Sequence, residues 1–206
     1  GLNTNSNNAK VVQKQNLDNS RCSGANDCVN FQASQIGSNQ NSNNAKIIQK
    51  QNLANSGCSG SFRCANFPAS QTGSNQNSNN AKIIQKQNLA NSGNGSNTAT
   101  QTGSNQNSNN AKIAQKQTLA NSGCGTKACR NDATQLGNIT NSNNAKIAQK
   151  QNLANNGCTG SCRNTALDNA TIVNSPGSKI IQTTGQISNG CSGTCKNNGT
   201  QTALIN

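Results

Sequence analysis

The sequence predicts an all-β protein, a β-solenoid of about six stacked rungs with disulfide-pinched loops. The prediction rests on a repeated sequence block, on alternating side chains inside that block, and on a shortage of hydrophobic residues. Leu, Ile, Val and Phe supply only 29 of the 206 residues, and Trp, Tyr and Met are absent. Burial of so few side chains could not offset the backbone entropy of a round core. The chain is therefore either disordered or built on a fold that needs little hydrophobic bulk per residue.

A repeated block favours the ordered alternative. The hexapeptide Asn-Ser-Asn-Asn-Ala-Lys occurs five times, at spacings of 36, 36, 30 and 34 residues. A period of about 20–50 residues is typical of solenoids, in which each unit stacks on its neighbours. The whole chain is expected to be one repeat domain, residues 1–206. Its repeats cover approximately residues 5–40, 41–76, 77–106, 107–140 and 141–176, with a degenerate sixth at 177–206.

Each repeat alternates like a β-strand. From residue 45 to residue 53, one set of side chains is Ala, Ile, Gln, Gln and Leu, and the other contains both lysines. Because two unpaired charges per strand cannot be buried, the set without lysine is expected to face inward. A second strand is expected where Ala65, Phe67, Ala69 and Gln71 alternate, as do Val29, Phe31, Ala33 and Gln35. Rungs stacked at about 4.8 Å would let Asn and Gln side chains form hydrogen-bonded ladders. The alternative, a disordered Asn-rich and Gln-rich tract, does not require alternation kept across five copies.

The composition argues against an enzyme. Glu and His are absent, and the four carboxylates Asp18, Asp27, Asp132 and Asp168 occupy no two equivalent positions of the repeat. General acid–base catalysis needs a titratable group poised near neutral pH, and no imidazole or carboxylate pair is present to supply one. We therefore expect no catalytic residue, no metal site and no cofactor.

Ten cysteines form five close pairs after equivalent turns of the repeats. The third repeat lacks both members of its pair, as local disulfides predict, and each such bridge would contribute about 2 kcal/mol. The pairs imply an oxidising compartment. Zinc is the alternative, but it would need four ligands from neighbouring loops without any His. The expected disulfides are Cys22–Cys28, Cys58–Cys64, Cys124–Cys129, Cys158–Cys162 and Cys191–Cys195.

The chain is strongly basic, with a formal net charge of +13. If one repeat is one rung, ten lysines form two outward columns that could bind an anionic polysaccharide or extracellular DNA. The alternative is a solvated face that keeps fibres soluble. Specific nucleic-acid recognition is not expected, because no aromatic platform is present. The ten lysines are Lys10, Lys14, Lys46, Lys50, Lys82, Lys86, Lys112, Lys116, Lys146 and Lys150.

The sequence also bears on location and modification. It contains no apolar run long enough to span a membrane, and it begins inside a repeat, so we expect a mature exported product at the cell surface or outside the cell. Glycosylation sequons occur at Asn94, Asn138, Asn169 and Asn198, and Asn94 lies in an expected loop.

The strand block resembles the repeats of the curli family of bacterial amyloid-like fibre subunits. Those repeats carry Gln-x-Gly-x2-Asn-x-Ala-x3-Gln. Here Gln71 and Gly73 are followed by Asn79, Ala81 and Gln85, with three extra residues after the glycine. The resemblance covers about half of each repeat and implies an exported fibre subunit of a biofilm or cell-surface appendage.

These observations together predict a structural subunit of an extracellular filament. The subunits would join end to end by rung stacking or by donation of the C-terminal strand, because an unpaired edge is a template for another chain. The expected contacts are Leu2, Ala203, Leu204 and Ile205. The alternative is a monomeric secreted solenoid that binds an anionic glycan or surface. An ice-binding solenoid fits less well, because the column of Ile36, Thr72, Thr102 and Leu136 is not a uniform threonine row.

Overall fold

The computed structural model describes residues 1–19, 28–30, 33–55, 64–92, 95–123, 128–157, 159–190 and 192–206. Within those ranges every regular element is a β-strand. The strands form two parallel sheets, which confirms the prediction of an all-β solenoid.

The two sheets are built from alternate strands along the chain. The first sheet contains β1 (Leu2–Thr4), β3 (Cys28–Asn30), β4 (Ala33–Gln40), β6 (Cys64–Gln76), β8 (Gly95–Gln106), β10 (Cys129–Thr140), β12 (Cys162–Val173) and β14 (Cys195–Ile205). The second sheet contains β2 (Asn8–Asn19), β5 (Asn44–Asn55), β7 (Asn80–Ser92), β9 (Asn110–Ser122), β11 (Asn144–Asn156) and β13 (Lys179–Asn189).

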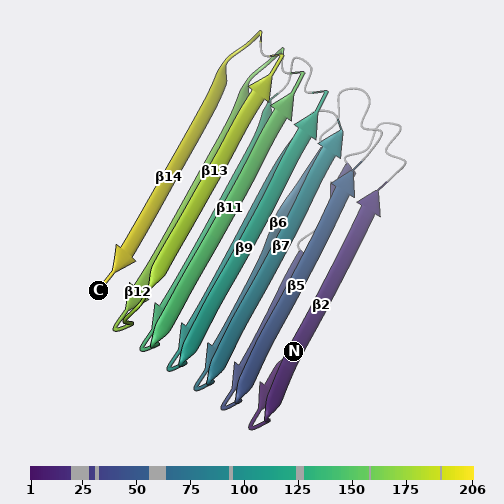
Figure 1. Cartoon of the computed structure of the whole chain (residues 1–206). Coiled ribbons are helices and arrows are strands. Elements are labelled where there is room, and N and C mark those ends of the chain that lie inside the picture. The colour runs from purple at the N-terminus through teal and green to yellow at the C-terminus, as the bar shows by residue number, and fades with distance from the viewer. Residues whose placement is uncertain are drawn as a thin grey trace.

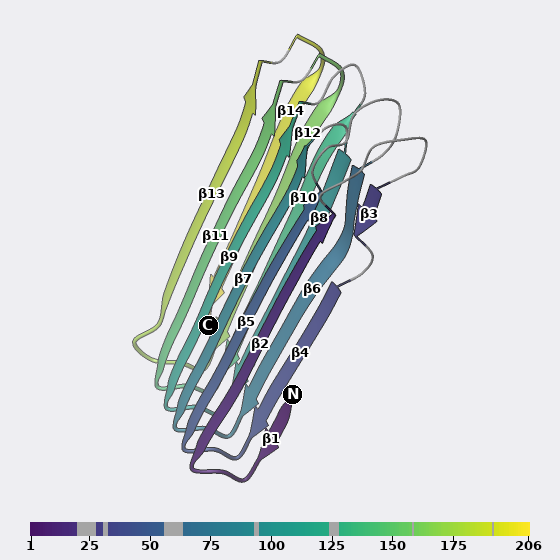
Figure 2. The same cartoon turned by 90° about the vertical axis from the view of Figure 1, so that its right-hand side faces the viewer.

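The chain coils from one sheet to the other and back, one repeat per turn. Figure 1 shows the second sheet in front, with β2 to β13 side by side, and Figure 2 shows both sheets from the side. Equivalent residues of successive repeats pair directly, as in Lys46 with Lys82 and Gln49 with Gln85. The path makes about five full turns from the arc at Asn5 to the arc at Asn174, and the last strands, β13 and β14, follow. The count of six full rungs is not confirmed.

The repeated Asn-Ser-Asn block forms the tight arc that joins the two sheets. Its first asparagine has a positive φ in every repeat, for example 53° at Asn41 and 52° at Asn77. Asparagine tolerates this left-handed conformation better than most residues with a side chain. The Asn77 amide also donates to Asn41 Oδ1 at 3.0 Å. The block therefore recurs because the arc requires an asparagine there and stacking then pairs its copies.

The inward set of side chains is the one that the alternation predicts. Ala45, Ile47, Gln49, Gln51 and Leu53 are all buried. Across the turns, the isoleucines form one hydrophobic cluster with neighbouring alanines, and the leucines form another with the alanines of the first sheet. The core is therefore a pair of narrow apolar columns separated by buried amides.

Glutamine ladders fill the space between the apolar columns, as expected from the composition. The Gln85 amide nitrogen donates to Gln49 Oε1 at 3.0 Å. The same nitrogen lies 2.9 Å from the carbonyl oxygens of Gln71 and Thr102, both in the first sheet. One side chain thus joins two rungs and both sheets, which explains how so little hydrophobic surface suffices.

The prediction fails in one strand. The pairing of β6 with β8 shifts between Asn66 and Ala69, where β6 has one residue more than its partner. The register places Asn66, and not Ala65, opposite the buried Asn97. Continuous alternation from Ala65 to Gln71 is therefore wrong, because a β-bulge resets the period. The corresponding Phe31 lies outside the described residues.

Candidate functional site

The outer face of the second sheet carries the predicted lysines in two columns. Each lysine pairs in register with the lysine of the next turn, as Lys82 does with Lys112 and Lys86 with Lys116. The first column is Lys10, Lys46, Lys82, Lys112 and Lys146, and the second is Lys14, Lys50, Lys86, Lys116 and Lys150. Lys179 extends the first column, whereas Thr183 follows Lys150 in the second.

Acidic groups do little to neutralise this face in the part of the chain that the structure describes. Asp18 is exposed at its N-terminal end, in register with Ala54. The one ion pair among the described residues joins Arg130 to Asp132 in the first sheet. The lysine columns therefore form a positive face that salt would screen strongly.

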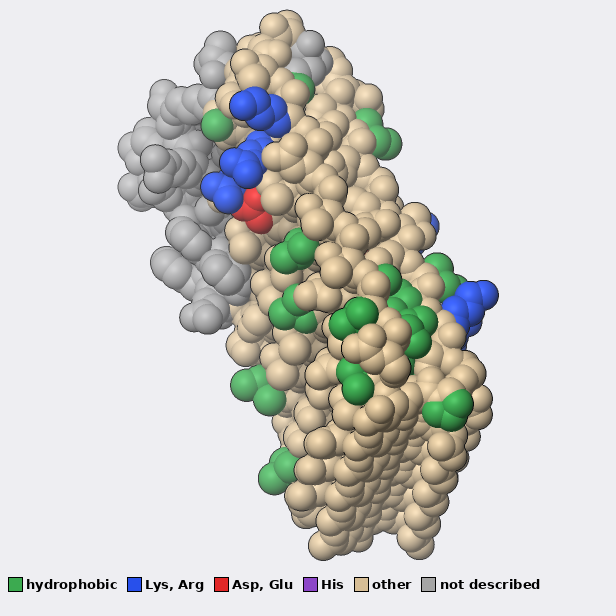
Figure 3. Space-filling view, turned by 90° about the vertical axis from the view of Figure 1, so that its left-hand side faces the viewer, with side chains coloured by type: hydrophobic (Ala, Val, Ile, Leu, Met, Phe, Trp, Pro, Cys, Tyr) green, Lys and Arg blue, Asp and Glu red, His purple; other side chains and the backbone are tan. Residues whose placement is uncertain are grey.

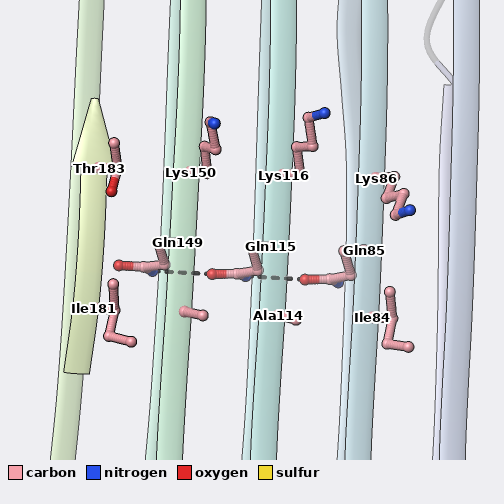
Figure 4. Close-up of a pocket in the computed structure, with 11 residues that line it drawn as sticks. Ile84, Gln85, Lys86, Ala114, Gln115, Lys116, Gln149, Lys150, Ile181 and Thr183 are labelled. Carbon is pink, nitrogen blue, oxygen red and sulfur yellow. Dashed lines mark hydrogen bonds between the residues drawn. The ribbon is translucent and has the colours of Figure 1, made fainter. Parts of the chain in front are cut away.

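A shallow apolar hollow lies between the two lysine columns. Figure 4 shows its floor beside Lys86, Lys116 and Lys150. The hollow encloses about 260 Å³ and runs from Ile84 to Ile181. It exists because this outward position is isoleucine in β7 and β13 but alanine in β9 and β11. The sequence contains a signal for this hollow, since the position loses its bulk in two adjacent repeats, at Ala114 and Ala148.

The predicted junction residues lie at opposite ends of the first sheet. Leu2 is on β1 and is 70% exposed, while Leu204 and Ile205 on β14 are 46% and 51% exposed. Ala203 is also exposed. Figure 3 views the molecule from the side on which β14 lies and shows hydrophobic side chains gathered there.

The interior of the solenoid is open at its C-terminal end. A polar hollow of about 410 Å³ lies between β13 and β14, lined by Gln182, Thr184, Gln186 and Gln201 together with Thr183 and Gly199. Gln182 and Gln201 belong to columns whose other glutamines are buried in the middle of the solenoid, but in this last turn their side chains are accessible.

The structure describes only one member of each predicted cysteine pair. Cys28 pairs in register with Cys64, and Cys129, Cys162 and Cys195 are aligned in the same way. No cysteine is free in the described part of the chain. The partners expected for them lie outside the described residues, so the pairing remains a prediction. Those partners are Cys22, Cys58, Cys124, Cys158 and Cys191.

Three of the four sequons are accessible. Asn138, Asn169 and Asn198 are exposed on strands of the first sheet. Asn94 lies outside the described residues. Glycans on these strands would lie on the opposite side of the molecule from the lysine columns.

The three aspartates that the structure describes lie on different strands, and Asp27 lies outside the described residues. Asp18 is exposed, Asp132 pairs with Arg130, and Asp168 is completely buried. The described ranges bring no three His, Cys, Asp or Glu side chains together as a metal site. They also contain no apolar helix of membrane-spanning length. Sequence reasoning treated Asp168 as isolated and missed its burial, although aligning the repeats places it in the column of Gln101 and Gln135.

Comparison of the chain with protein-family models, with curated proteins and with solved structures found no match. The resemblance to curli repeats is therefore not tested by relatives, and function has to be argued from the geometry.

Proposed function

We propose that this protein is the structural subunit of an extracellular filament and that subunits join end to end by continuing the solenoid. The observation that carries the proposal is the direction of the amide ladders. The glutamine ladder that runs through the whole second sheet has a donor end and an acceptor end, so the two ends of the solenoid are chemically complementary in this column.

The glutamine ladder of the second sheet points toward the N-terminal end. The amide nitrogen of each glutamine donates to the oxygen of the preceding turn, as Gln49 does to Gln13 and Gln182 does to Gln149, both at 2.9 Å. At the N-terminal end, Gln13 therefore directs its amide nitrogen outward. At the C-terminal end, Gln182 directs its oxygen outward.

The buried asparagine ladders of the first sheet run the other way. Asn3 donates to Asn39 at 3.2 Å, and Asn164 donates to Asn197 at 2.9 Å. The column of Asn3 and Asn39 continues as Ile139, Ile172 and Ile205. The column of Asn164 reaches Asn197 in the last turn. Stacking the C-terminal end of one copy on the N-terminal end of the next therefore brings the acceptor of Gln182 to the donor of Gln13. Stacking two like ends would oppose acceptor to acceptor, at a cost of about 1–3 kcal/mol for each buried group left unpaired.

The lysine columns favour growth along the axis. Two copies placed side by side through their second sheets would bring unneutralised lysines together, and this repulsion would weaken lateral association. End-to-end contact is heterologous, and such contacts build open filaments when the rotation does not close.

Variants of adjacent residues on β14 test the proposal. Ala203 pairs with the buried Ala170, whereas Thr202 pairs with the exposed Asn169. Ala203→Lys should place a charge in the junction and raise the critical concentration for assembly at least about tenfold. Thr202→Lys adds the same charge on the outer face and should assemble nearly as the wild type, as measured by sedimentation. Equal assembly of both variants would contradict stacking at this end.

Deletion of residues 200–206 tests the strand-donation version of the same junction. If β14 enters the neighbouring subunit, the truncated chain should fold but not polymerise. Unaffected assembly would exclude strand donation.

We further propose that the paired cysteines pinch the loops as disulfides, which fits an exported protein. Each bridge would close a loop of only a few residues and add about 2 kcal/mol. Mass spectrometry of the non-reduced protein should find Cys124 linked to Cys129 and Cys158 linked to Cys162. Links between different turns would contradict local pinching.

A second candidate function is binding of an anionic polysaccharide along the lysine columns. The exposed lysines on either side of an apolar floor favour it, because a linear polyanion could follow the axis with a charge near each rung. Binding should weaken steeply with salt, and Lys116→Gln with Lys150→Gln should reduce it. If filaments form but bind no polyanion, this second function is excluded and the structural role remains.

A further inference from the structure

A buried acid interrupts the glutamine ladder of the first sheet. The ladder runs through Gln35, Gln71, Gln101 and Gln135, and each amide nitrogen donates to the preceding side chain at 3.0–3.1 Å. The next member in register is Asp168, followed by Gln201. Asp168 is completely buried.

The substitution removes the donor that the ladder needs at this point. An ionised carboxylate has no hydrogen to donate to the side chain below it. Gln135 Oε1 and Asp168 Oδ1 are both buried and have no hydrogen-bond partner in the structure. Two acceptors thus occupy positions where every earlier rung has a donor and an acceptor.

The other carboxylate oxygen is already satisfied. Thr184 Oγ1 donates to Asp168 Oδ2 at 2.8 Å and accepts from the Gln201 amide nitrogen at 2.9 Å. Thr184 lies on β13 and Gln201 on β14. Asp168 therefore connects residues of both strands of the last rung to the glutamine ladder of the first sheet, beside the bonds that Gln182 and Asn197 make to other ladders.

We propose that Asp168 is the neutral carboxylic acid in the folded protein, donates its proton to Gln135 Oε1, and makes the last rung, β13 and β14, loosen as the pH rises. The proton replaces the missing amide hydrogen and makes the ladder continuous. When the proton leaves, a buried charge and two opposed acceptors remain.

The surroundings of Asp168 favour the neutral form. Burial raises the pKa of this carboxyl, and the hydrogen bonds from Thr184 and Gln201 lower it only in part. The groups that face it are amides and a hydroxyl: Gln135 of β10, Gln151 of β11, Thr184 of β13 and Gln201 of β14.

No described cation points inward at this level to compensate the charge. The charged side chains of the packed strands lie on the outer faces of the two sheets. They are Arg130 and Asp132 on β10, Lys146 and Lys150 on β11, Arg163 on β12, Lys179 on β13, and Lys196 on β14.

The direction of the pH effect follows from where the proton is held. In the unfolded chain Asp168 ionises near its ordinary pKa of about 3.9, whereas the folded chain keeps the proton to higher pH. Between these two pKa values the folded state binds more protons, so stability falls as the pH rises. The loss is complete once the pH exceeds the folded pKa.

Asp168→Asn is the matched variant, since the amide has the shape of the acid but always carries a donor. Hydrogen-exchange protection factors of β14 and of the central strand β8 should be measured between about pH 4 and pH 8. In the wild type, protection of β14 should fall by up to about tenfold per pH unit until the folded pKa is passed. In Asp168→Asn it should stay constant, and β8 should not respond in either protein.

Infrared spectroscopy of the wild type with isotope-labelled aspartate gives a second readout that needs no variant. A protonated carboxyl signal should persist at pH values above the ordinary aspartate pKa of about 3.9. Loss of that signal at the ordinary pKa, or equal pH responses of β14 in both proteins, would overturn the proposal. These measurements report on a single chain, so their outcome does not depend on whether the proposed filament forms.

Discussion

The central turns and the last turn of the solenoid have equivalent inward positions, but the buried hydrogen-bond ladders are complete only in the central turns. In β7 and β9, inward glutamines such as Gln85 and Gln117 are at most marginally exposed and bond to both neighbouring turns. In β13 and β14, the equivalent Gln182 is half-buried, Thr184 stands in the position of the other glutamine, and Ile205 is 51% exposed.

This difference shows what stabilises the fold. Among the described residues, the buried side-chain amide atoms without a hydrogen-bond partner lie where a ladder changes residue type: Asn105 is followed by Ile139, Gln135 by Asp168, and Gln151 by Thr184. Where the ladder repeats the same amide, each group finds its partner. Order in this chain therefore depends on identical residues being stacked, more than on hydrophobic bulk.

The largest expected effect comes from breaking a central ladder. Gln85→Ala would remove the bonds to the facing sheet, and it would leave Gln49 Oε1 without its donor and the Gln115 amide nitrogen without one of its two acceptors. Since each unpaired buried group costs about 1–3 kcal/mol, denaturant unfolding should show a loss of about 3 kcal/mol or more.

Two controls sharpen that comparison. Gln182→Ala in the same column of the last turn should cost about 1 kcal/mol, because solvent can replace the lost bonds. Asn88→Ala removes the exposed ladder bond to Asn52 and should cost about 0.5 kcal/mol. Equal losses from all three variants would contradict a special role for buried ladders.

A smaller effect is expected from overfilling a central turn. A Cβ added at Gly103 would lie 2.8 Å from Ile113 Cγ2, whereas one added at Gly199 in the last turn would have no neighbour nearer than 3.6 Å. Gly103→Ala should destabilise by about 1–3 kcal/mol, and Gly199→Ala should change stability little. Thermal unfolding of the two variants checks this difference, and a neutral Gly103→Ala would show that the central packing can relax.

The arcs should respond to backbone conformation. Asn107 has φ of 53°, so Asn107→Val should cost about 1–2 kcal/mol more than Asn107→Gly, which should lose mainly the side-chain bonds to Asn77 and from Asn141. Urea midpoints of the two variants separate strain from the lost hydrogen bond. A valine variant as stable as the glycine variant would exclude backbone strain as the reason for asparagine.

The smallest effect on folding is expected at the lysine face. Lys116→Gln relieves repulsion from Lys86 and Lys150 and should raise stability by a few tenths of a kcal/mol at low salt, with no gain at high salt. Unfolding at two ionic strengths measures this change. A salt-independent change would point to packing of the lysine stem instead.

Much of this fold could be predicted because one repeat contains the rule for all of them. Lys46 and Lys50 predict which side of the strand faces inward, because their charges cannot be buried unpaired. The recurrence of glutamine at the position of Gln49 predicts a hydrogen-bonded ladder between turns. The β-bulge after Asn66 could not be predicted, because the apolar residues Ala65, Phe67 and Ala69 keep the period-two spacing of an uninterrupted strand. The hollow at Ala114 and Ala148 and the burial of Asp168 follow only when neighbouring repeats are aligned position by position, because a single repeat does not show which residues become neighbours between turns.

Cryo-electron microscopy of the purified, non-reduced protein tests most directly whether copies continue one another's solenoid. The account predicts long filaments in which the strand spacing of about 4.8 Å runs unbroken through each junction, with all copies pointing the same way. Discrete particles, or filaments that alternate in direction, would contradict it.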